Sequence, residues 1–371
     1  MTREEYCVKV EEAISQFPFE GSLISYERYG NGHINDTFVI HCKRNDDTPI
    51  RYILQRMNHD VFKNPEQLMK NIKGITEFLK KKIAADHGDI HRETMNIIPT
   101  KAGNSFYKDT IGSYWRVYEF IENATCFEMV KEPDDFYQSA IAFGNFQKLL
   151  ADYPAESLYE TIPDFHNTPL RLETFKKAVK DDILNRAEEV TEEIDFIMER
   201  EAFTHILMDA YKEGELPLKV THNDTKLNNI MIDDKTGKAI CVIDLDTVMP
   251  GFSVNDFGDS IRFGASTGAE DEPDLSKVNF DLPLYELYTR GFLQGCKGSL
   301  TKTETDMLPT GAKMMTFECG IRFLTDYLSG DTYFRIHREK HNLDRARTQF
   351  KLVADMERNW ETMNEIVNKY R

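Results

Sequence analysis

The chain has 371 residues, of which 40% are hydrophobic and 29% are charged. This length suits two packed lobes or one large α/β domain, and the balance of residue types is typical of a folded globular protein. The formal net charge of −17 argues against a general binder of nucleic-acid backbones, because such proteins gather lysine and arginine. A phosphate-bearing ligand must therefore be held locally, by a metal ion and a few placed cations.

Cysteines and apolar runs bear on where the protein works. The six cysteines are scattered without a CxxC spacing, which disfavours a zinc site or a disulfide framework. The first residues are charged and contain no apolar stretch typical of a signal peptide. No segment approaches the roughly 18 apolar residues of a membrane-spanning helix. We therefore expect a cytoplasmic protein with no membrane, nucleic-acid or obligatory protein partner.

The first third of the chain is predicted to be rich in strands. Residues 23–42 read as a strand, a glycine-containing turn and a second strand, and residues 51–57 form a further apolar strand. Asn64 then begins a helix, because Pro65 suits the first helical position and Gln67 lies three residues after the cap. Residues 113–123 form another strand, and its polar end is a candidate hinge.

The rest of the chain is predicted to be mainly helical. Apolar residues recur at helical spacing in three places: residues 136–150, the charged segment 171–212, and the C-terminal segment from Leu343 to Met363. The layout predicts an α+β protein with two lobes. A β-rich nucleotide-binding lobe spans residues 1–122 and ends in the hinge, and a mainly α-helical catalytic and substrate-binding lobe spans residues 123–371.

The most informative segment runs from Val220 to Gly251. Asp224 follows His222 and Asn223, Asn229 lies five residues after Asp224, and Asp244 ends the apolar strand 239–243. Phosphoryl transfer needs one residue to orient the attacking hydroxyl and oxygen ligands to hold Mg²⁺ beside a triphosphate. Asp224 suits the first task as the catalytic base, and the amide oxygen of Asn229 and the carboxylate of Asp244 suit the second.

A hairpin explains how two separated residues can share one metal ion. Residues 229–234 and 239–244 flank a turn that contains Thr236 and Gly237. If those two residues form a two-residue loop, the cross-strand pairing places Asn229 opposite Asp244. A bulge or a longer loop would shift this pairing.

Three neighbouring carboxylates leave alternatives open. Asp256 begins the tripeptide Asp-Phe-Gly that carries a metal ligand in protein kinases, but Asp244 follows a strand directly, so Asp256 is interpreted as a brace for the catalytic loop. Asp246 is either a second metal ligand or a local hydrogen-bond acceptor. The sequence Asp244-Leu245-Asp246 after a strand also resembles the nucleophile motif of haloacid-dehalogenase-type phosphatases, which leaves the His222–Asp224 segment without a role.

The array from His222 to Asp244 resembles the aminoglycoside phosphotransferase and choline kinase branch of the protein-kinase-like fold. A set of motifs, GHINDTF, QRMN, FKNPEQLMKNI, HNDTKLNNIM, IDLDTVMPG, DFGDSIRFGA and RFLTDYLSGDTYF, is similar to bacterial N-acetylhexosamine 1-kinases from about residue 30 to about residue 335. The resemblance implies a bilobal fold, ATP with Mg²⁺, and phosphorylation of the anomeric hydroxyl of N-acetylglucosamine or N-acetylgalactosamine. It leaves the preference between the two sugars open.

The resemblance also implies roles for individual residues. Asp224 would be the base, and Asn229 and Asp244 the metal ligands. The nucleotide would contact the glycine turn, a strand cation and the hinge 118–122, namely Gly30, Gly32, Arg56, Glu119 and Ile121. The sugar would contact His33, Asp36, Arg322 and Tyr333.

Two departures from the family pattern concern the nucleotide. The turn at Tyr29–Gly32 has few glycines, and the strand position usually filled by a phosphate-binding lysine falls at Gln55 or Arg56. Alternation along the strand turns only one of these two side chains inward, and its helix partner, Glu66 or Glu77, is equally open. Alternative functions are a kinase for another amino sugar, choline or homoserine, and a binding module without activity.

Overall fold

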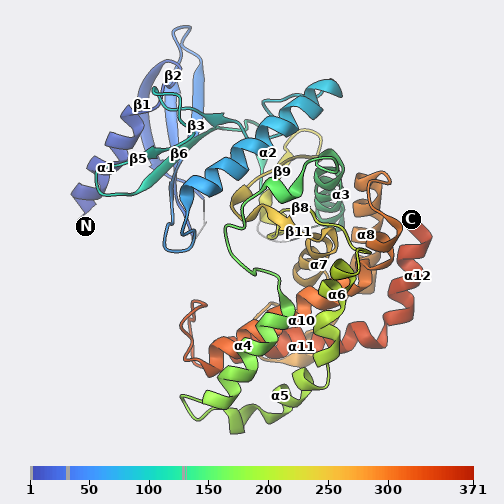
Figure 1. Cartoon of the computed structure of the whole chain (residues 1–371). Helices are drawn as coiled ribbons and strands as arrows, with labels where there is room; N and C mark the ends of the chain where they lie inside the picture. The colour runs from blue at the N-terminus through green and yellow to red at the C-terminus, as the bar shows by residue number, and fades with distance from the viewer. Residues whose placement is uncertain (1–2, 31–33, 128–129, 131) are drawn as a thin grey trace. The chain divides into compact units, whose positions relative to one another are not determined.

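The computed structural model describes residues 3–30, 34–127, 130 and 132–371. The chain forms two compact units (Figure 1). Unit 1 comprises Met1–Thr125, Met231–Thr236 and Ile240–Val248, and unit 2 comprises Cys126–Ile230, Gly237–Ala239 and Met249–Arg371. Unit 1 thus takes in most of the segment 231–248, which we had assigned to the C-terminal lobe.

Unit 1 is an antiparallel sheet with two helices. Its main sheet has the strand order β1-β2-β3-β6-β4, with β5 also paired to β6. The elements in chain order are α1 (Arg3–Ser15), β1 (Ser22–Arg28), β2 (Asp36–Lys43), β3 (Pro49–Met57), α2 (Pro65–Ala85), β4 (Ile97–Ile98), β5 (Tyr107–Lys108) and β6 (Tyr114–Glu119). The side chain of Asn64 accepts a hydrogen bond from the Gln67 amide at 3.1 Å, which confirms the predicted helix start.

Helix α1 was missing from the sequence prediction, which placed one helix in this part of the chain. Val10, Ala13, Ile14 and Phe17 are buried against the sheet, and Figure 1 shows α1 lying along the strands. Their spacing is that of one helical face. The signal was present but weak, because charged residues surround a stripe of only four apolar positions.

The two faces of the main sheet have different chemistry. Leu54, Trp115 and Val117 point to the apolar side covered by α1. Gln55 and Arg116, their neighbours in sequence, point to the opposite side, where Arg116 contacts Met69 of α2. This period of two follows from the pleat of a strand.

The predicted hairpin is present in a second sheet. Strands β9 (Ile230–Asp233) and β10 (Ala239–Val242) are neighbours, and β9 also pairs with β7 (Ala124–Thr125). The connection between β9 and β10 spans residues 234–238, so it is longer than the two-residue loop we predicted. The opposition of Asn229 and Asp244, which depended on that loop, remains a prediction.

Asp233 holds this turn in place. Its Oδ1 accepts hydrogen bonds from the Thr236 amide at 2.7 Å and the Thr236 hydroxyl at 2.8 Å, and its Oδ2 lies 2.8 Å from a guanidinium nitrogen of Arg92. Arg92 also donates to the carbonyls of Glu122 and Asn123. These hydrogen bonds lower the pKa of Asp233 to about 2, and the bond from Arg92 contributes most.

Acid should therefore weaken unit 1 through Asp233. An unfolded aspartate has a pKa near 3.9, so the stabilisation is fully present above about pH 4 and is lost as the pH falls towards 2. We expect Asp233→Asn to lower Tm at pH 6 and to lower it progressively less from pH 4 to pH 2.5. Thermal melts of both proteins over this range, with Asp60→Asn as a surface control, measure the effect. A Tm difference independent of pH would contradict it.

Unit 2 is mainly helical. Its helices are α3 (Pro133–Leu149), α4 (Thr168–Asp181), α5 (Thr191–Met198), α6 (Ile206–Lys212), α7 (Ser253–Gly264), α8 (Leu282–Cys296), α9 (Lys302–Asp306), α10 (Leu308–Leu328), α11 (His341–Arg358) and α12 (Trp360–Tyr370). Its two-stranded antiparallel sheet pairs β8 (Lys219–Thr221) with β11 (Met249–Gly251).

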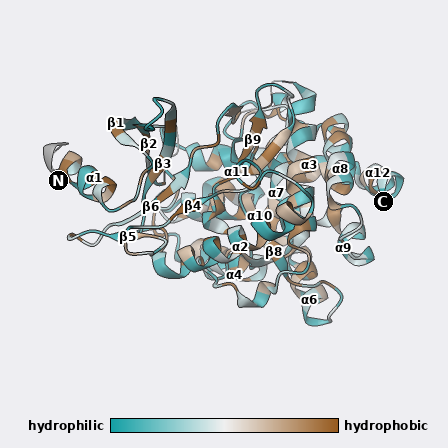
Figure 2. Ribbon diagram, turned by 90° about the horizontal axis from the view of Figure 1, so that it is seen from above, coloured by the Kyte–Doolittle hydropathy of each residue, from teal (hydrophilic) through white to brown (hydrophobic). Residues whose placement is uncertain are grey.

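Helix α10 lies at the centre of unit 2 and packs on α4, α7 and α11. Figure 2 shows apolar and hydrophilic stretches alternating along these helices, as expected when one face is buried. Helices α7 and α10 approach closely at two glycines. A Cβ at Gly258 would lie 2.2 Å from the Gly311 carbonyl oxygen, and a Cβ at Gly311 would lie 2.2 Å from that of Val254. Only glycine permits this approach, which fixes α7 beneath the catalytic loop.

No helix within the described ranges is long and apolar enough to cross a membrane.

Candidate functional site

The loop 222–225 leaves strand β8 and is held by helix α7. Asn223 has a left-handed backbone (φ 63°), a conformation that asparagine tolerates better than most residues. Asp256 accepts hydrogen bonds from the amides of His222 at 2.9 Å and Asn223 at 2.8 Å. Three residues further along α7, Asp259 accepts from the Thr225 amide at 3.0 Å. One face of α7 therefore fixes the backbone on both sides of Asp224.

Asp256 is a brace, as we interpreted it. Its carboxylate is 1% exposed and also accepts from Gln147 Nε2 at 2.8 Å. Burial raises the pKa of the Asp256 carboxyl, and the hydrogen bonds from His222 and Asn223 offset only part of that rise. The carboxylate oxygens are occupied by donors from the loop and from α3, so the side chain orders the loop.

Asp224 is presented by two neighbours on the same loop. Its Oδ1 lies 2.7 Å from Lys226 Nζ, and its Oδ2 accepts from Asn229 Nδ2 at 3.1 Å. Asn229 Nδ2 also donates to the Asp224 carbonyl at 2.8 Å. The structure thus brings Asp224 and Asn229 together. With its nitrogen so engaged, Asn229 keeps its amide oxygen for another partner.

Lys226 was missed from the sequence. Burial disfavours its ammonium, but Asp224 and Asp259 outweigh burial and raise the pKa of Lys226. Asp259 is held in turn by Arg262 Nη2 at 3.0 Å, and Arg262 Nη1 reaches Glu270 at 2.7 Å. The i, i+3 spacing of Asp256 and Asp259 was the available signal, because on a helix it places both carboxylates on one face.

Asp244 lies in unit 1, two residues after the end of β10. Its backbone is left-handed (φ 57°, ψ 61°), which turns the chain sharply between the strand and a short 3₁₀ helix, Leu245–Thr247. Asp246 lies in that 3₁₀ helix, and its carboxylate forms a bidentate ion pair with Arg116. Of the two roles considered for Asp246, metal ligand and hydrogen-bond acceptor, the structure therefore shows the second.

Tyr29, at the start of the glycine turn, lies beside the hinge segment of unit 1. Gly30 has φ 73°, and a Cβ there would meet no atom within 4 Å. The ring of Tyr29 contacts that of Phe120 at a centroid distance of 5.7 Å. Glu119 pairs with His91 at 2.9 Å, and Ile121 is buried. Gly32 and His33, predicted for nucleotide and sugar, lie outside the described residues.

Asp36 and Arg56 are bonded to each other in unit 1. Asp36 Oδ2 lies 2.7 Å from Arg56 Nη2 and accepts from the Tyr6 hydroxyl at 2.6 Å, and its Oδ1 lies 2.8 Å from Arg28. Arg56 therefore faces α1, on the opposite side of β3 from Gln55. Of the two strand residues whose direction was open, Gln55 points to the side where Asp246 lies, since both contact Arg116.

Arg322 and Tyr333, both predicted for the sugar, are neighbours in unit 2. An Arg322 guanidinium nitrogen lies 3.5 Å from the Tyr333 hydroxyl. The guanidinium also lies 5.4 Å from the Phe165 ring and 5.5 Å from the Phe334 ring. Asp326 accepts from the amides of residues 332–334 and so fixes the Tyr333 loop. Tyr333 itself is 69% exposed.

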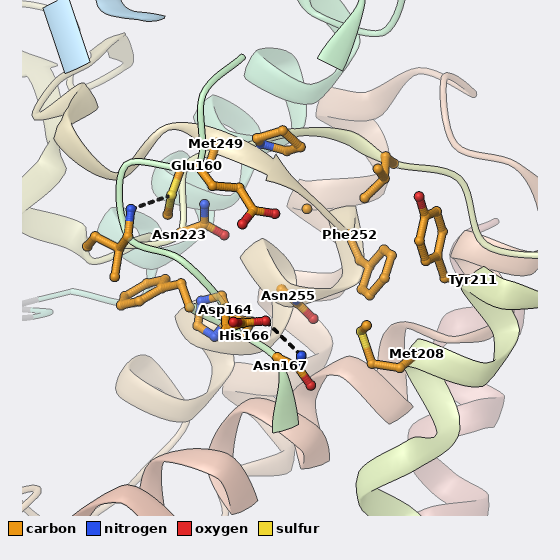
Figure 3. Close-up of a pocket in the computed structure, with 15 residues that line it drawn as sticks. Glu160, Asp164, His166, Asn167, Met208, Tyr211, Asn223, Met249, Phe252 and Asn255 are labelled. Carbon is orange, nitrogen blue, oxygen red and sulfur yellow. Dashed lines mark hydrogen bonds between the residues drawn. The ribbon is translucent and has the colours of Figure 1, made fainter. Parts of the chain in front are cut away.

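A pocket of about 180 Å³ opens beside this cluster in unit 2 (Figure 3). His166 Nδ1 is 2.8 Å from Glu318, while its Nε2 and the Oδ1 of Asn255 are buried without a hydrogen-bond partner. A buried polar atom without a partner is costly, so both atoms favour a polar occupant. The lining residues labelled in the figure are Glu160, Asp164, His166, Asn167, Met208, Tyr211, Asn223, Met249, Phe252 and Asn255.

The donor set fits a hard divalent cation only in part. Within the described ranges, no three histidine, cysteine, aspartate or glutamate side chains gather as a metal site. Mg²⁺ commonly takes only one or two carboxylates, with water and substrate phosphates completing its shell. An amide oxygen such as that of Asn229 and a carboxylate such as that of Asp244 are ligands of the kind that Mg²⁺ accepts.

A family model described as the phosphotransferase enzyme family matches residues 25–289. The chain belongs to this family. The match contains the glycine turn, the catalytic loop, Asp244 and α7 in one continuous stretch. This phosphotransferase assignment removes the haloacid-dehalogenase-type phosphatase from consideration.

Solved structures of small-molecule kinases share the fold. A microcompartment-associated aminopropanol kinase is 14% identical with a TM-score of 0.62, over 96% of this chain and 98% of that one. An aminoglycoside phosphotransferase from Alicyclobacillus acidocaldarius is 11% identical with a TM-score of 0.62, over 97% and 96%. Amicoumacin kinase, in complex with AMP-PNP and Ca²⁺, is 12% identical with a TM-score of 0.53, over 99% and 94%. The α+β kinase-like fold, with a sheet-rich N-lobe and a helical C-lobe, is therefore confirmed.

The chain is thus assigned to the phosphotransferase enzyme family, and it has the fold of the kinases above.

Proposed function

We propose that this phosphotransferase transfers the γ-phosphate of ATP to the anomeric C1 hydroxyl of N-acetylglucosamine or N-acetylgalactosamine, with Mg²⁺. The observation that carries the proposal is that Arg322 of α10 and Tyr333 of the following loop lie together in unit 2. Asp326 holds that loop in place. Their motif, RFLTDYLSGDTYF, is one of those similar to N-acetylhexosamine 1-kinases. An arginine beside aromatic rings suits a sugar, which offers several hydroxyl acceptors and an apolar ring face.

The catalytic loop supplies the chemistry. Asp224 orients the C1 hydroxyl, whose oxygen attacks the γ-phosphorus while the bond to the β-phosphate oxygen breaks and ADP leaves. The hydroxyl proton passes to the Asp224 carboxylate. Lys226 and Asn229 hold that carboxylate in one orientation. Mg²⁺, held by Asn229 and Asp244, would neutralise charge on the phosphates.

A second acceptor class is favoured by the pocket. Glu160 and Asp164 are part of its lining, and carboxylates suit an amino alcohol. Choline fits less well, because the aromatic rings of Phe165, Tyr333 and Phe334 already surround the Arg322 guanidinium. A quaternary ammonium needs such rings for itself and is repelled by a neighbouring arginine.

The activity test uses MgATP with single acceptors. N-acetylglucosamine, N-acetylgalactosamine, glucosamine, glucose, 1-amino-2-propanol, homoserine and choline are compared by ADP release and ³¹P NMR. The control acceptor is the methyl glycoside of N-acetylglucosamine, whose C1 oxygen is blocked. We expect a sugar 1-phosphate signal from the N-acetylhexosamines and none from the glycoside. Phosphorylation of the glycoside, or of 1-amino-2-propanol alone, rejects the anomeric proposal.

Substitution of Arg322 tests the sugar contact. We expect Arg322→Met to raise KM for the N-acetylhexosamine roughly 10- to 150-fold, because a lost hydrogen bond to a charged group costs about 1.5–3 kcal/mol. KM for ATP should stay within about twofold if the loss is confined to acceptor recognition. Arg290→Met is the matched control, because Arg290 also lies over a tyrosine ring, that of Tyr137, away from the cluster. An equal effect of both variants would contradict a sugar contact at Arg322.

A further inference from the structure

Arg116 is a fully buried cation that the family pattern did not lead us to expect. Its side chain is 1% exposed. Its nitrogens lie 2.5 Å and 2.9 Å from the two carboxylate oxygens of Asp246, and two of them lie 3.0 Å and 2.8 Å from Gln55 Oε1. The Sδ of Met69 lies 3.9 Å from Nη1. These contacts use all five N–H donors of the guanidinium.

Asp246 extends this network to the segment after the glycine turn. Its Oδ2 also accepts from Asn35 Nδ2 at 2.7 Å, and Asn35 Oδ1 accepts from the Asn58 amide at 3.0 Å. Asp246 lies only two residues beyond Asp244, within the 3₁₀ helix that follows the left-handed turn. All of these residues belong to unit 1. A single buried ion pair thus links the Asp244 turn, two strands and Asn35, the residue before β2.

The electrostatics agree with this geometry. Burial acts to lower the pKa of the Arg116 guanidinium, but Asp246 and, further away, Asp244 raise it above its usual value. The arginine therefore stays charged and compensates carboxylates around the turn. Arg56, the cation expected on strand β3, pairs instead with Asp36 on the other face of the sheet.

We propose that Arg116 is a positioning residue for phosphoryl transfer: it clamps Asp246, and so fixes the turn that presents Asp244 and the segment beside the glycine turn. Asp246 is the acceptor of this clamp and does not bind the metal. The effect of Arg116 on catalysis rests on the proposed kinase reaction, whereas the contacts that form the clamp lie within unit 1. A bidentate pair fixes direction as well as distance, which a single lysine cannot reproduce.

Three variants test the clamp. Arg116→Lys keeps the charge and loses the fork, Asp246→Asn keeps the shape and loses the charge, and Arg116→Met with Asp246→Leu removes the pair without leaving a lone buried charge. Arg44→Gln is the control, because Arg44 pairs with Glu20 elsewhere in unit 1. The readouts are MgADP affinity by calorimetry, which needs no acceptor, and the Mg²⁺ concentration for half-maximal turnover, with circular dichroism to verify folding.

We expect each single variant to weaken MgADP binding or the Mg²⁺ response roughly 10- to 100-fold, as for other residues that orient a metal ligand. The double variant should match the singles, because residues acting as a unit are not additive, and KM for the acceptor should not change. A loss in Asp246→Asn with none in Arg116→Lys would make Asp246 a metal ligand and overturn the proposal. If the single variants do not fold, the double variant decides: unchanged MgADP affinity there rejects the clamp.

The readouts separate the two proposals. If the wild-type protein does not phosphorylate N-acetylhexosamines, the proposed acceptor is wrong, yet MgADP binding by the variants still tests Arg116. If the sugar is phosphorylated and every variant binds MgADP as the wild type does, the clamp is wrong and the acceptor stands.

Discussion

Asp224→Ala is expected to lower kcat by a factor of roughly 10² to 10⁴, the usual contribution of a positioned proton acceptor. The carboxylate lies on a braced loop, 2.7 Å from Lys226 Nζ and 3.1 Å from Asn229 Nδ2. Its removal leaves the attacking hydroxyl without an acceptor for its proton. Steady-state kinetics with the best acceptor, together with MgADP affinity, measure the effect, and the affinity should change little.

Two further variants separate chemistry from structure at Asp224. Asp224→Asn keeps the size of the side chain and an oxygen for Lys226, so it should fold like the wild type and lose nearly as much activity as the alanine variant. Asp209→Ala is the matched control, because Asp209 is a surface aspartate that also pairs with a lysine, Lys212. Near-normal turnover in Asp224→Asn would show that the proton acceptor lies elsewhere.

Asp256→Ala is expected to reduce both stability and activity. The substitution leaves the buried amides of His222 and Asn223 without their acceptor. A buried donor without a partner costs about 1–3 kcal/mol, so the two amides together amount to about 2–6 kcal/mol. That is a large part of the roughly 5–15 kcal/mol that stabilises a typical protein. Urea unfolding measures the stability loss, and kcat of the folded fraction measures the loosening of the loop.

The comparison variant is Asp256→Asn. Asparagine keeps one oxygen acceptor, which can serve Gln147 and His222 as Asp256 Oδ2 does now, while its amide nitrogen faces the Asn223 donor. We expect about half the loss of stability seen for alanine. A variant that is destabilised but retains full kcat would show that the loop needs no brace to act, which is contrary to the role assigned to α7.

Much of the fold follows from local sequence patterns. The alternation in β2, β3 and β6 and the cap at Asn64 report short-range geometry, which a strand or helix imposes on its neighbours in sequence. Asp224 and Asn229 are only five residues apart, so their contact is also a short-range one, although it was not predicted from the sequence. Helix α1 was not predicted, because its apolar stripe is narrow and its burial depends on a sheet formed by later residues.

The roles of the charged residues depend on distant partners. The sequence around Asp246 is compatible with a metal ligand and with a hydrogen-bond acceptor. Only the fold places Arg116, 130 positions away, against its carboxylate. Arg56 and Gln55 point to opposite faces of strand β3. The contact of Arg56 with Asp36 and that of Gln55 with Arg116 show which face each one takes. By itself the sequence determined the class of enzyme, and it predicted which residues carry the chemistry. The tertiary structure decided which carboxylates brace and which remain for chemistry, because a buried charge is defined by the partner that compensates it.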